Sequence, residues 1–265
     1  MSDLRIPFID FTAQRERIGN EVKEAVGRVI DTQQFILNRN VSDLEAKIAE
    51  KLGSLFAIGV ASGSDALYLA LWAMGIGPGD EVIVPPFTFF ATAGAVSRTG
   101  ATPVFADVDS KTFNLDPVQF ERRISRKTKA VIPVHLFGLP CDMDEIARIA
   151  RKNSILVVED AAQSFGATYF GRQTAAIGDA GCLSFFPTKN LGGAGDGGMV
   201  TTASPELADK IKMLRVHGSK KKYFHEAIGI NSRLDEMQAA VILTKLKYID
   251  EWNALRQTLA RHYNE

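Results

Sequence analysis

Neither sign of charge is in excess in this sequence, and long apolar runs are missing from it. Lysine plus arginine and aspartate plus glutamate number 31 each, which gives a formal net charge of zero. The sequence therefore lacks the basic footprint of a nucleic-acid-binding domain, and we expect no nucleic-acid partner. No apolar run approaches the length of a membrane span, so we expect no membrane-spanning segment either.

Cysteine is also scarce, with only Cys141 and Cys182 present. Two cysteines make neither a disulfide framework nor a metal site, so we predict no bound metal. Each is expected to be a small buried apolar side chain in a reducing compartment. The first residues, which include Asp3, Arg5 and Pro7, lack the apolar core of a signal peptide. These features together predict a cytoplasmic protein.

The chain of 265 residues, 46% of them hydrophobic, is long enough for one large domain with a sizeable core. Apolar residues at helical spacing alternate along it with short apolar runs. This alternation predicts an α/β fold, in which helices cover both faces of a mostly parallel sheet. We expect helices at 14–32, 66–74, 90–97, 117–124 and 143–152, one more opened by a capping box at 42–45, and strands at 81–84, 103–108, 130–136, 155–158 and 199–202.

One long helical pattern runs from Arg233 nearly to the last residue. It reaches Glu265 without a terminal glycine or a proline, the usual signs that a helix ends. We therefore expect that residues 1–265 form one large domain with an N-terminal helical segment, and that the long helix leads toward a further domain.

One lysine lies between an apolar run and a glycine-rich loop. Lys189 follows the sequence Ser-Phe-Phe-Pro-Thr at 184–188 and precedes five glycines within residues 192–198. Glycines at this density let the backbone turn tightly and approach a ligand closely. A lysine with so little other charge around it is expected to be partly desolvated, which lowers the pKa of the amine and suits a Schiff-base nucleophile. The alternative is a solvated lysine in a surface loop.

Small polar residues follow two strands, at the edge where open α/β sheets bind their ligands. The sequence Gly-Ser-Asp at 63–65 opens a helix, so its backbone N–H groups and the Ser64 hydroxyl could hold a phosphate. An ordinary helix cap explains the same residues. Ser184 lies five residues before Lys189 and could contact the same phosphate, or it could be merely a hydroxyl in a strand.

A carboxylate and an aromatic residue follow two other strands. Asp160 ends a buried strand and needs a cationic partner, because an unpaired buried charge is costly. A pyridinium N–H would supply one, and so would a structural ion pair. The aromatic residues at 87–89 could stack on a flat ring or pack into the core. A lysine, a carboxylate, an aromatic and small polar residues together fit pyridoxal 5'-phosphate as the cofactor.

Five motifs also carry a family resemblance: Gly-Ser-Asp-Ala-Leu at 63–67, Pro-Phe-Thr-Phe at 86–89, Glu-Asp-Ala-Ala-Gln at 159–163, Ser-Phe-Phe-Pro-Thr-Lys at 184–189 and Gly-Ile-Asn-Ser-Arg at 229–233. In this order they resemble the nucleotide-sugar aminotransferases of the DegT family, which are fold-type-I pyridoxal-phosphate enzymes. The resemblance implies a three-layer α/β/α large domain like that of aspartate aminotransferase, and a small C-terminal domain that we expect to be missing from residues 1–265.

The resemblance also implies a role for each matching residue. Lys189 would carry the cofactor, Asp160 would face its ring nitrogen, Phe89 would stack on the ring and Gln163 would lie near the ring hydroxyl. Ser64 stands where many relatives have threonine, a change that keeps the hydroxyl. The phosphate site would comprise Gly63, Ser64, Asp65 and Ser184, together with Asn231 from a second subunit, so that the active site requires a homodimer.

Within the family, the stretch 217–233 is most similar to enzymes that aminate a 3-keto UDP-linked N-acetylhexosamine or its uronic acid. The resemblance implies transfer of an amino group from an amino acid, glutamate, to a nucleotide-linked ketosugar in aminosugar or cell-surface polysaccharide biosynthesis. Arg233 could hold a carboxylate of either substrate, or it could be a structural arginine at a helix start. Thr188, adjacent to Lys189, and Gln33, by likeness to the family's N-terminal loop, are further substrate-binding candidates.

Two other functions compete with transamination. A sugar dehydratase of the same fold would have histidine in place of Lys189, so this lysine argues against it. A non-catalytic or regulatory protein that retains the fold remains an alternative.

Overall fold

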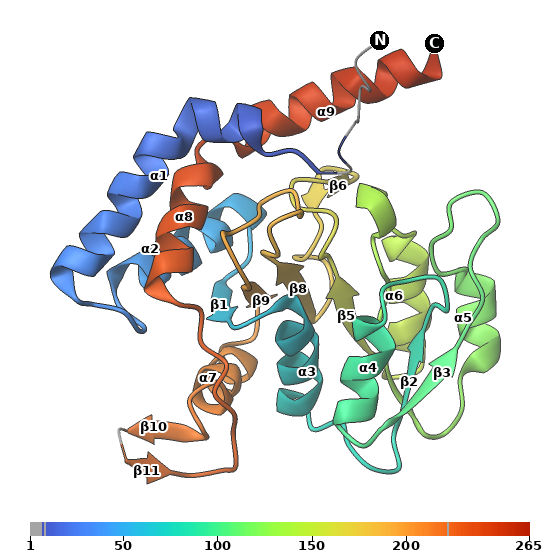
Figure 1. Cartoon of the computed structure of the whole chain (residues 1–265). Helices are drawn as coiled ribbons and strands as arrows, with labels where there is room; N and C mark the ends of the chain where they lie inside the picture. Colours follow the sequence, from blue (N-terminus) through green and yellow to red (C-terminus); the bar gives the residue numbers. More distant parts are fainter. Residues whose placement is uncertain (1–6, 8, 222) are drawn as a thin grey trace.

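A seven-stranded sheet lies at the centre of the computed structural model, which describes residues 7, 9–221 and 223–265 (Figure 1). The strand order is β1-β9-β8-β5-β4-β2-β3, and every neighbouring pair is parallel except the two that β9 makes with β1 and β8. The prediction of a mostly parallel sheet is thereby confirmed. The strands are β1 (Phe56–Val60), β2 (Glu81–Val84), β3 (Thr102–Phe105), β4 (Thr128–Val131), β5 (Leu156–Asp160), β8 (Ala180–Ser184) and β9 (Gly198–Thr202).

Helices cover both faces of this sheet (Figure 1). One face packs against α3 (Gly63–Ala73), α4 (Ala91–Arg98) and α7 (Pro205–Leu214). The other packs against α2 (Arg39–Leu52) and α8 (Glu236–Leu246) over β1, β8 and β9, and against α5 (Pro117–Arg123) and α6 (Met143–Lys152) over β2, β4 and β5. Outside these layers, α1 (Thr12–Thr32) packs on α8. The last helix, α9 (Ile249–Asn264), comes directly after α8 in the chain.

Alternate residues of the central strands enter the two cores. Val82 and Val84 of β2 face the α3 side, whereas Ile83 between them faces the α6 side, and all three are fully buried. Side chains on a strand point alternately to opposite faces, so a strand covered on both sides must be apolar throughout. Each such side chain contributes about 1.5–3 kcal/mol through its burial. The short apolar runs of the sequence arise from this arrangement.

The predicted capping box at residues 42–45 does not start a helix. The cap of α2 is Asn38, whose side-chain oxygen accepts from the Arg39 N–H at 2.9 Å, and the Ser42 hydroxyl donates to the Arg39 carbonyl within the helix. The backbone N–H groups of the next two residues, Asn40 and Val41, donate to the carboxylate of Glu236 at the start of α8. A long-range partner therefore moves the helix start upstream of the local signal.

The single long helix predicted from Arg233 onward is wrong. The chain forms two helices, α8 and α9, which run in different directions and are separated at Tyr248 (Figure 1). The Tyr248 hydroxyl donates to Glu21 of α1 at 2.8 Å, and its ring stacks on Trp252. The tertiary contact with α1 and the local stack at the start of α9 accompany this bend, which contains neither proline nor glycine. Strand β4 likewise ends before Pro133, short of the predicted residue 136, because proline has no N–H for the ladder.

Both cysteines are free and buried, as predicted. Burial raises the pKa of the Cys141 thiol to about 12 and that of Cys182 well above its usual range. The thiolate is the reactive form of cysteine, so both side chains act as packing groups. Among the helices that the structure describes, none has the length and apolar character needed to cross a membrane.

Candidate active site

A cavity of about 410 Å³ opens at the carboxyl ends of β5 and β8, beside the first turn of α3. This is the edge at which ligands bind in open α/β sheets. Eight of the residues that the sequence predicts for the site line this one cavity: Gly63, Ser64, Phe89, Asp160, Gln163, Ser184, Thr188 and Lys189. The structure thus brings together side chains that lie up to 126 positions apart in the chain, from Gly63 to Lys189.

Asp160 is the buried acid of the cavity, with 5% of its surface exposed. Its carboxylate accepts a hydrogen bond from the Thr92 hydroxyl at 2.8 Å and one from the Ala162 N–H at 3.2 Å. Burial raises the pKa of this carboxyl group, while the two hydrogen bonds and the nearby charges of His135 and Lys189 act in the opposite direction. Both hydrogen-bond donors are uncharged, and no cation of the described residues contacts the carboxylate. A cationic N–H from a ligand would therefore stabilise the charged form of Asp160.

The first turn of α3 makes the opposite end of the cavity. Ser62 caps the helix, and its hydroxyl accepts the Asp65 N–H at 3.1 Å. The N–H groups of Gly63 and Ser64 remain at the open end of the helix, where the dipole favours an anion. The Ser64 and Ser184 side chains, both of which line the cavity, add hydroxyl donors beside them. A helix terminus with two such hydroxyls suits a phosphate group.

Glycine is required where the start of α3 meets the end of β8 and the start of β9. A Cβ atom added to Gly63 would lie 2.6 Å from the Cβ of Ser184, and one added to Gly198 would lie 2.4 Å from the carbonyl carbon of Ser62. Both distances are shorter than packed carbon atoms allow, so any side chain here would push the helix away from the strand ends. The two glycines therefore set the close approach on which the phosphate site depends.

Lys189 is half-buried and lies on a tight turn, in which its N–H donates to the Phe186 carbonyl at 2.9 Å. The glycine loop then folds back over this turn. A Cβ atom on Gly192 would lie 2.3 Å from the Pro187 carbonyl oxygen, so only glycine permits this return. Within the residues that the structure describes, the Lys189 amine forms no salt bridge. The amine is thus held at the cavity without a carboxylate in contact.

Two residues of α8 hold this loop in place, and the sequence analysis did not identify them. The Gln238 side-chain oxygen accepts the Ala194 N–H at 2.8 Å, and the Lys245 ammonium donates to the Gly192 carbonyl at 2.8 Å. Gln238 and Lys245 are separated by about two turns and so lie on the same face of the helix. Their spacing is the only signal in the sequence that relates them, and it does not indicate which loop they contact.

Gln163 and Phe89 lie at the wall and the rim of the cavity. The Gln163 side-chain oxygen accepts the Phe137 N–H at 2.9 Å, which leaves its NH₂ group free to donate toward a hydroxyl or phenolate oxygen of a ligand. Phe89 is 69% exposed, so its ring face is available for stacking. Behind it, the Thr88 hydroxyl is 2.9 Å from that of Thr92, which extends the hydrogen-bonded chain from Asp160 to the cavity wall.

A second buried acid, Glu159, supports the strand end from the other side of the sheet. It is fully buried and accepts four hydrogen bonds, from His135 Nε2 at 2.9 Å and from the N–H groups of Ala175, Ile177 and Gly178. The Nδ1 atom of His135 accepts the backbone N–H of Cys141, and the backbone N–H of His135 donates to the Asp160 carbonyl. This network, also missed from the sequence, fixes the backbone that carries Asp160.

Four predicted site residues do not line the cavity. The Asp65 carboxylate forms an ion pair with Arg98 at 2.8 Å and turns away from the phosphate site. Asn231 is exposed, Arg233 is half-buried, and Gln33 ends α1 in the left-handed conformation. Asn231, Arg233 and Gln33 lie in two segments that the structure brings together at another place on the chain.

Those segments meet at the start of α8. Ile36 forms a bridge with Asp235, so the chain just after Gln33 runs beside the chain just after Arg233. The Ser232 hydroxyl, fully buried between Asn231 and Arg233, accepts the Ala61 N–H at 3.1 Å. Gln33, Asn231 and Arg233 therefore belong to one anchored surface outside the cavity.

The cavity fits pyridoxal 5'-phosphate in its chemistry. The helix terminus with its two serines suits the phosphate, the Asp160 carboxylate suits a protonated ring nitrogen, and the Lys189 amine suits the aldehyde. The buried Asp160 carboxylate, which has hydrogen bonds but no cation in contact among the described residues, and the close approach maintained by Gly63 are observations of this structure that a cofactor explains.

Comparison with known proteins gives a consistent result. Residues 16–265 match the family model described as the DegT/DnrJ/EryC1/StrS aminotransferase family. A UDP-N-acetyl-3-dehydro-alpha-D-glucosamine 3-aminotransferase of Acidithiobacillus ferrooxidans is 48% identical, and a protein of Geobacillus stearothermophilus described as a pleiotropic regulatory protein is 49% identical, each over 98% of this chain and 70% of the relative. The crystal structure of S. venezuelae DesV in complex with a ketimine intermediate matches with a TM-score of 0.95 and 47% identity, over 98% of this chain and 70% of that one. The chain belongs to the DegT/DnrJ/EryC1/StrS aminotransferase family.

Proposed function

We propose that this protein is a pyridoxal-phosphate-dependent aminotransferase that moves an amino group from glutamate to a nucleotide-linked ketosugar. What supports this function above all is that Lys189, Asp160 and the first turn of α3 border one cavity. A lysine nucleophile, a buried carboxylate and an anion site are the three groups that the cofactor needs from a protein. Membership of an aminotransferase family agrees with this chemistry.

Each residue has a separate task. When bound, the cofactor supplies a ring that accepts the electron pair left behind when a substrate carbon loses its proton. The Asp160 carboxylate holds a proton on the ring nitrogen by charge and hydrogen bonding, and Thr92 keeps that carboxylate oriented. The Lys189 Nζ atom, once free, takes the proton from one carbon and returns it to another as general base and acid. Ser64, Ser184 and the α3 N–H groups bind the phosphate and fix the ring.

The substrate class follows from the family and from one stretch of sequence. The relative from Acidithiobacillus ferrooxidans is named for a UDP-linked 3-keto aminosugar. The resemblance of residues 217–233 to enzymes of that type supports a UDP-linked 3-ketosugar, or its uronic acid, as the acceptor. Two buried free thiols agree with a reducing compartment, so we place the reaction in the cytoplasm.

We further infer that the enzyme is a homodimer with shared active sites. Asn231 is exposed and outside its own chain's cavity, although the buried Ser232 beside it is firmly anchored. An amide that is held rigidly at a surface suits the phosphate site of a neighbouring copy. Arg233 would then reach the same neighbouring cavity as a substrate-binding residue.

A regulatory protein without catalysis is the second candidate, because the relative from Geobacillus stearothermophilus carries a regulatory description. A visible spectrum with added cofactor separates the two functions. The enzyme gives the yellow band of a lysine-bound cofactor, whereas a protein that has lost the reaction and the cofactor gives none.

Lys189→Ala should abolish both this visible band and transamination, because no other amine of the described residues lines the cavity. Absorbance spectra and a coupled assay measure the two effects. Lys247→Ala, which removes an exposed lysine paired with Glu21, is the matched control and should keep both. Undiminished turnover in Lys189→Ala would show that the lysine does not take part.

Asp160→Asn should lower cofactor affinity by about ten- to a hundredfold, the loss expected for a charge-assisted hydrogen bond. The same change should raise the melting temperature of the cofactor-free protein at neutral pH. Because burial raises the pKa of Asp160 in the folded state, the folded chain binds the proton more tightly, and stability falls as the pH rises above the ordinary carboxyl pKa. The gain should therefore vanish at low pH. A lower melting temperature at all pH values would indicate a structural role instead.

Mixing Lys189→Ala with Asn231→Ala subunits should restore activity, because one site of each heterodimer then has both native residues. The control is a mixture of Lys189→Ala and Asp160→Asn. Both residues line the cavity of a single chain, so every heterodimer site carries a defect and the mixture should be no more active than Asp160→Asn alone. Verified heterodimers that recover no activity in the first mixture would mean that each chain builds its own site.

Arg233→Ala should raise the Michaelis constant about tenfold or more for a uronic-acid sugar, and much less for the same sugar with a 6-hydroxymethyl group. The guanidinium would lose a charge-assisted contact with the carboxylate, worth about 1.5–3 kcal/mol. Steady-state kinetics on the matched sugars measure the ratio. Equal losses on both, together with a lower melting temperature, would identify Arg233 as a structural residue.

A further inference from the structure

Both ends of the glycine loop line the candidate active-site cavity, whereas its middle does not. Lys189 lies at one end, Asp196 and Gly197 lie at the other, and the residues between them do not line the cavity. The loop is closed on the strand end before it. The Gly193 N–H donates to the Phe185 carbonyl at 2.7 Å, and the Phe185 N–H donates to the Gly197 carbonyl at 2.8 Å. Whatever holds the middle of the loop therefore also sets the end that carries Lys189.

Three glycines of the loop leave room for side chains at the start of α8. A Cβ atom added to Gly193 would lie 2.7 Å from the Gln238 side-chain oxygen, and one added to Gly195 would lie 2.9 Å from the nitrogen of the same amide. One added to Gly197 would lie 2.9 Å from Cδ1 of Leu234. Larger residues at these positions would displace both side chains. The glycine density, which the sequence alone relates to a bound ligand, thus also serves the packing of this part of the chain on the loop.

The Gln238 amide occupies the space that two of these glycines leave. Its oxygen accepts the Ala194 N–H at 2.8 Å, and Ala194 stands between the two glycines, so one side chain contacts three consecutive residues. About two turns further along α8, the Lys245 ammonium donates to the Gly192 carbonyl at 2.8 Å. Two polar side chains from one face of a helix thus hold residues 192–195.

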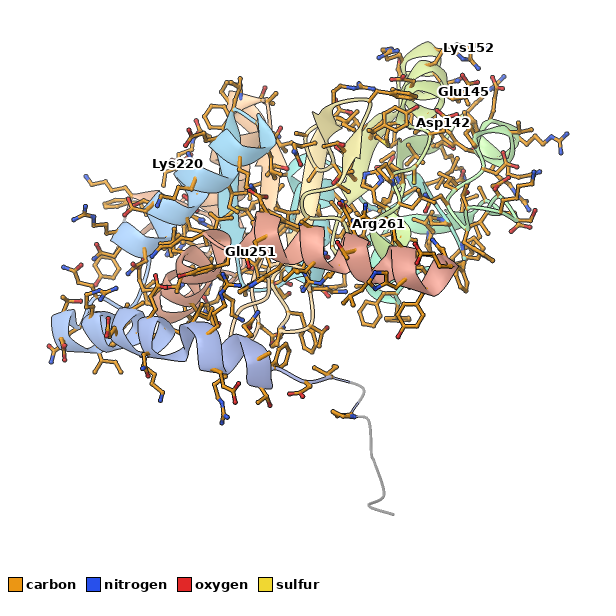
Figure 2. All side chains as sticks on the ribbon, turned by 90° about the horizontal axis from the view of Figure 1, so that it is seen from above. Asp142, Glu145, Lys152, Lys220, Glu251 and Arg261 are labelled. Atoms are coloured by element: carbon orange, nitrogen blue, oxygen red, sulfur yellow. The ribbon has the colours of Figure 1, made fainter. Side chains whose placement is uncertain are left out.

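Helix α8 is itself fixed at both ends. At its start, the buried Glu236 carboxylate accepts three backbone N–H groups from the beginning of α2. Just beyond its end, the Tyr248 hydroxyl donates to Glu21 of α1. Figure 2 shows α9, labelled at Glu251, beside the first turns of α1, where Arg17 pairs with Glu251. A helix that is anchored in this way can hold the loop in one position.

We propose that Gln238 is a positioning residue for the reactive lysine. By holding Ala194, its amide sets the loop that presents the Lys189 amine to the cavity, and Lys245 supports the same loop one contact away. This role rests on the transaminase function and adds to it a residue that does not line the cavity. A displacement of about 1 Å between reacting atoms can lower a rate about a hundredfold, so an amine that moves a proton between two carbons depends on such support.

Amide hydrogen exchange of the cofactor-free chain, read by mass spectrometry on the peptide that contains residues 190–196, measures the hold on the loop. Gln238→Met removes the acceptor and keeps the length of the side chain, so exchange should become about tenfold faster, the effect of one lost hydrogen bond. Gln238→Glu keeps an acceptor oxygen and should restore slow exchange. Thr244→Val removes a buried hydroxyl that donates to its own helix, at the Ala240 carbonyl, and is the matched control that should exchange as the unaltered chain does.

Steady-state kinetics and cofactor titration separate positioning from general destabilisation. Gln238→Met should lower kcat about tenfold or more with little change in the Michaelis constant for the ketosugar, because the chemical step and not substrate binding loses its geometry. Cofactor affinity, read from the visible band of the lysine-bound cofactor, should fall in parallel. Gln238→Glu should recover most of both. Thr244→Val should keep both even where its melting temperature falls. Lys245→Met, which removes the donor to Gly192, should act in the same direction as Gln238→Met.

Native kcat and cofactor affinity in both Gln238→Met and Lys245→Met would overturn the proposal, as would unchanged loop exchange in both. Faster exchange with native cofactor affinity would also overturn it, since Gln238 would then support the loop alone. Equal losses in Thr244→Val would do the same. An unaltered chain that takes up cofactor and transfers no amino group would contradict the transaminase function, whereas lower cofactor affinity in Gln238→Met would still support the positioning of Lys189.

Discussion

The structure depends on two neighbouring acids at the end of one buried strand. Glu159 and Asp160 point to opposite faces of the sheet, and both are at least nine-tenths buried. Glu159 is satisfied within the protein by one histidine and three backbone N–H groups. Asp160 has a hydroxyl and one N–H, and burial raises its pKa. One acid thus organises the fold around the strand end, and its neighbour is left for a cationic partner from outside the chain.

The cavity owes its shape to close backbone approaches that need no side chain. Gly63 permits α3 to meet Ser184, and Gly192 permits the loop after Lys189 to fold back on Pro187. Neither contact would be possible with a Cβ atom, so the anion site and the lysine are set by packed backbone and do not rely on mobile side chains. Because α8 holds the loop through Lys245, the position of the lysine also depends on a helix that packs against α1, α2 and the sheet.

Much of the cavity could be predicted from the sequence because parallel strands place their carboxyl ends at one edge. Asp160, Ser184 and the residues of the α3 turn each follow a strand signal, and that rule alone brings them together. Thr92, Gln238 and Lys245 could not be found in this way, since their roles come from contacts between elements far apart in the chain. The start of α2 was misplaced for the same reason.

Glu236 shows how such a distant contact works. Fully buried at the start of α8, its carboxylate accepts the N–H groups of Asn38, Asn40 and Val41, and so closes the open end of α2 from 195 or more residues away. No other charged group of the described residues caps that helix end. The same contact fixes the chain from Gln33 to Asn38 against the chain that carries Arg233. A buried charge and the buried Ser232 thus hold in place a surface whose own polar side chains do not line their chain's cavity. Rigid anchoring beneath exposed polar groups is what a recognition surface requires, because the ordering cost is met before a second molecule arrives.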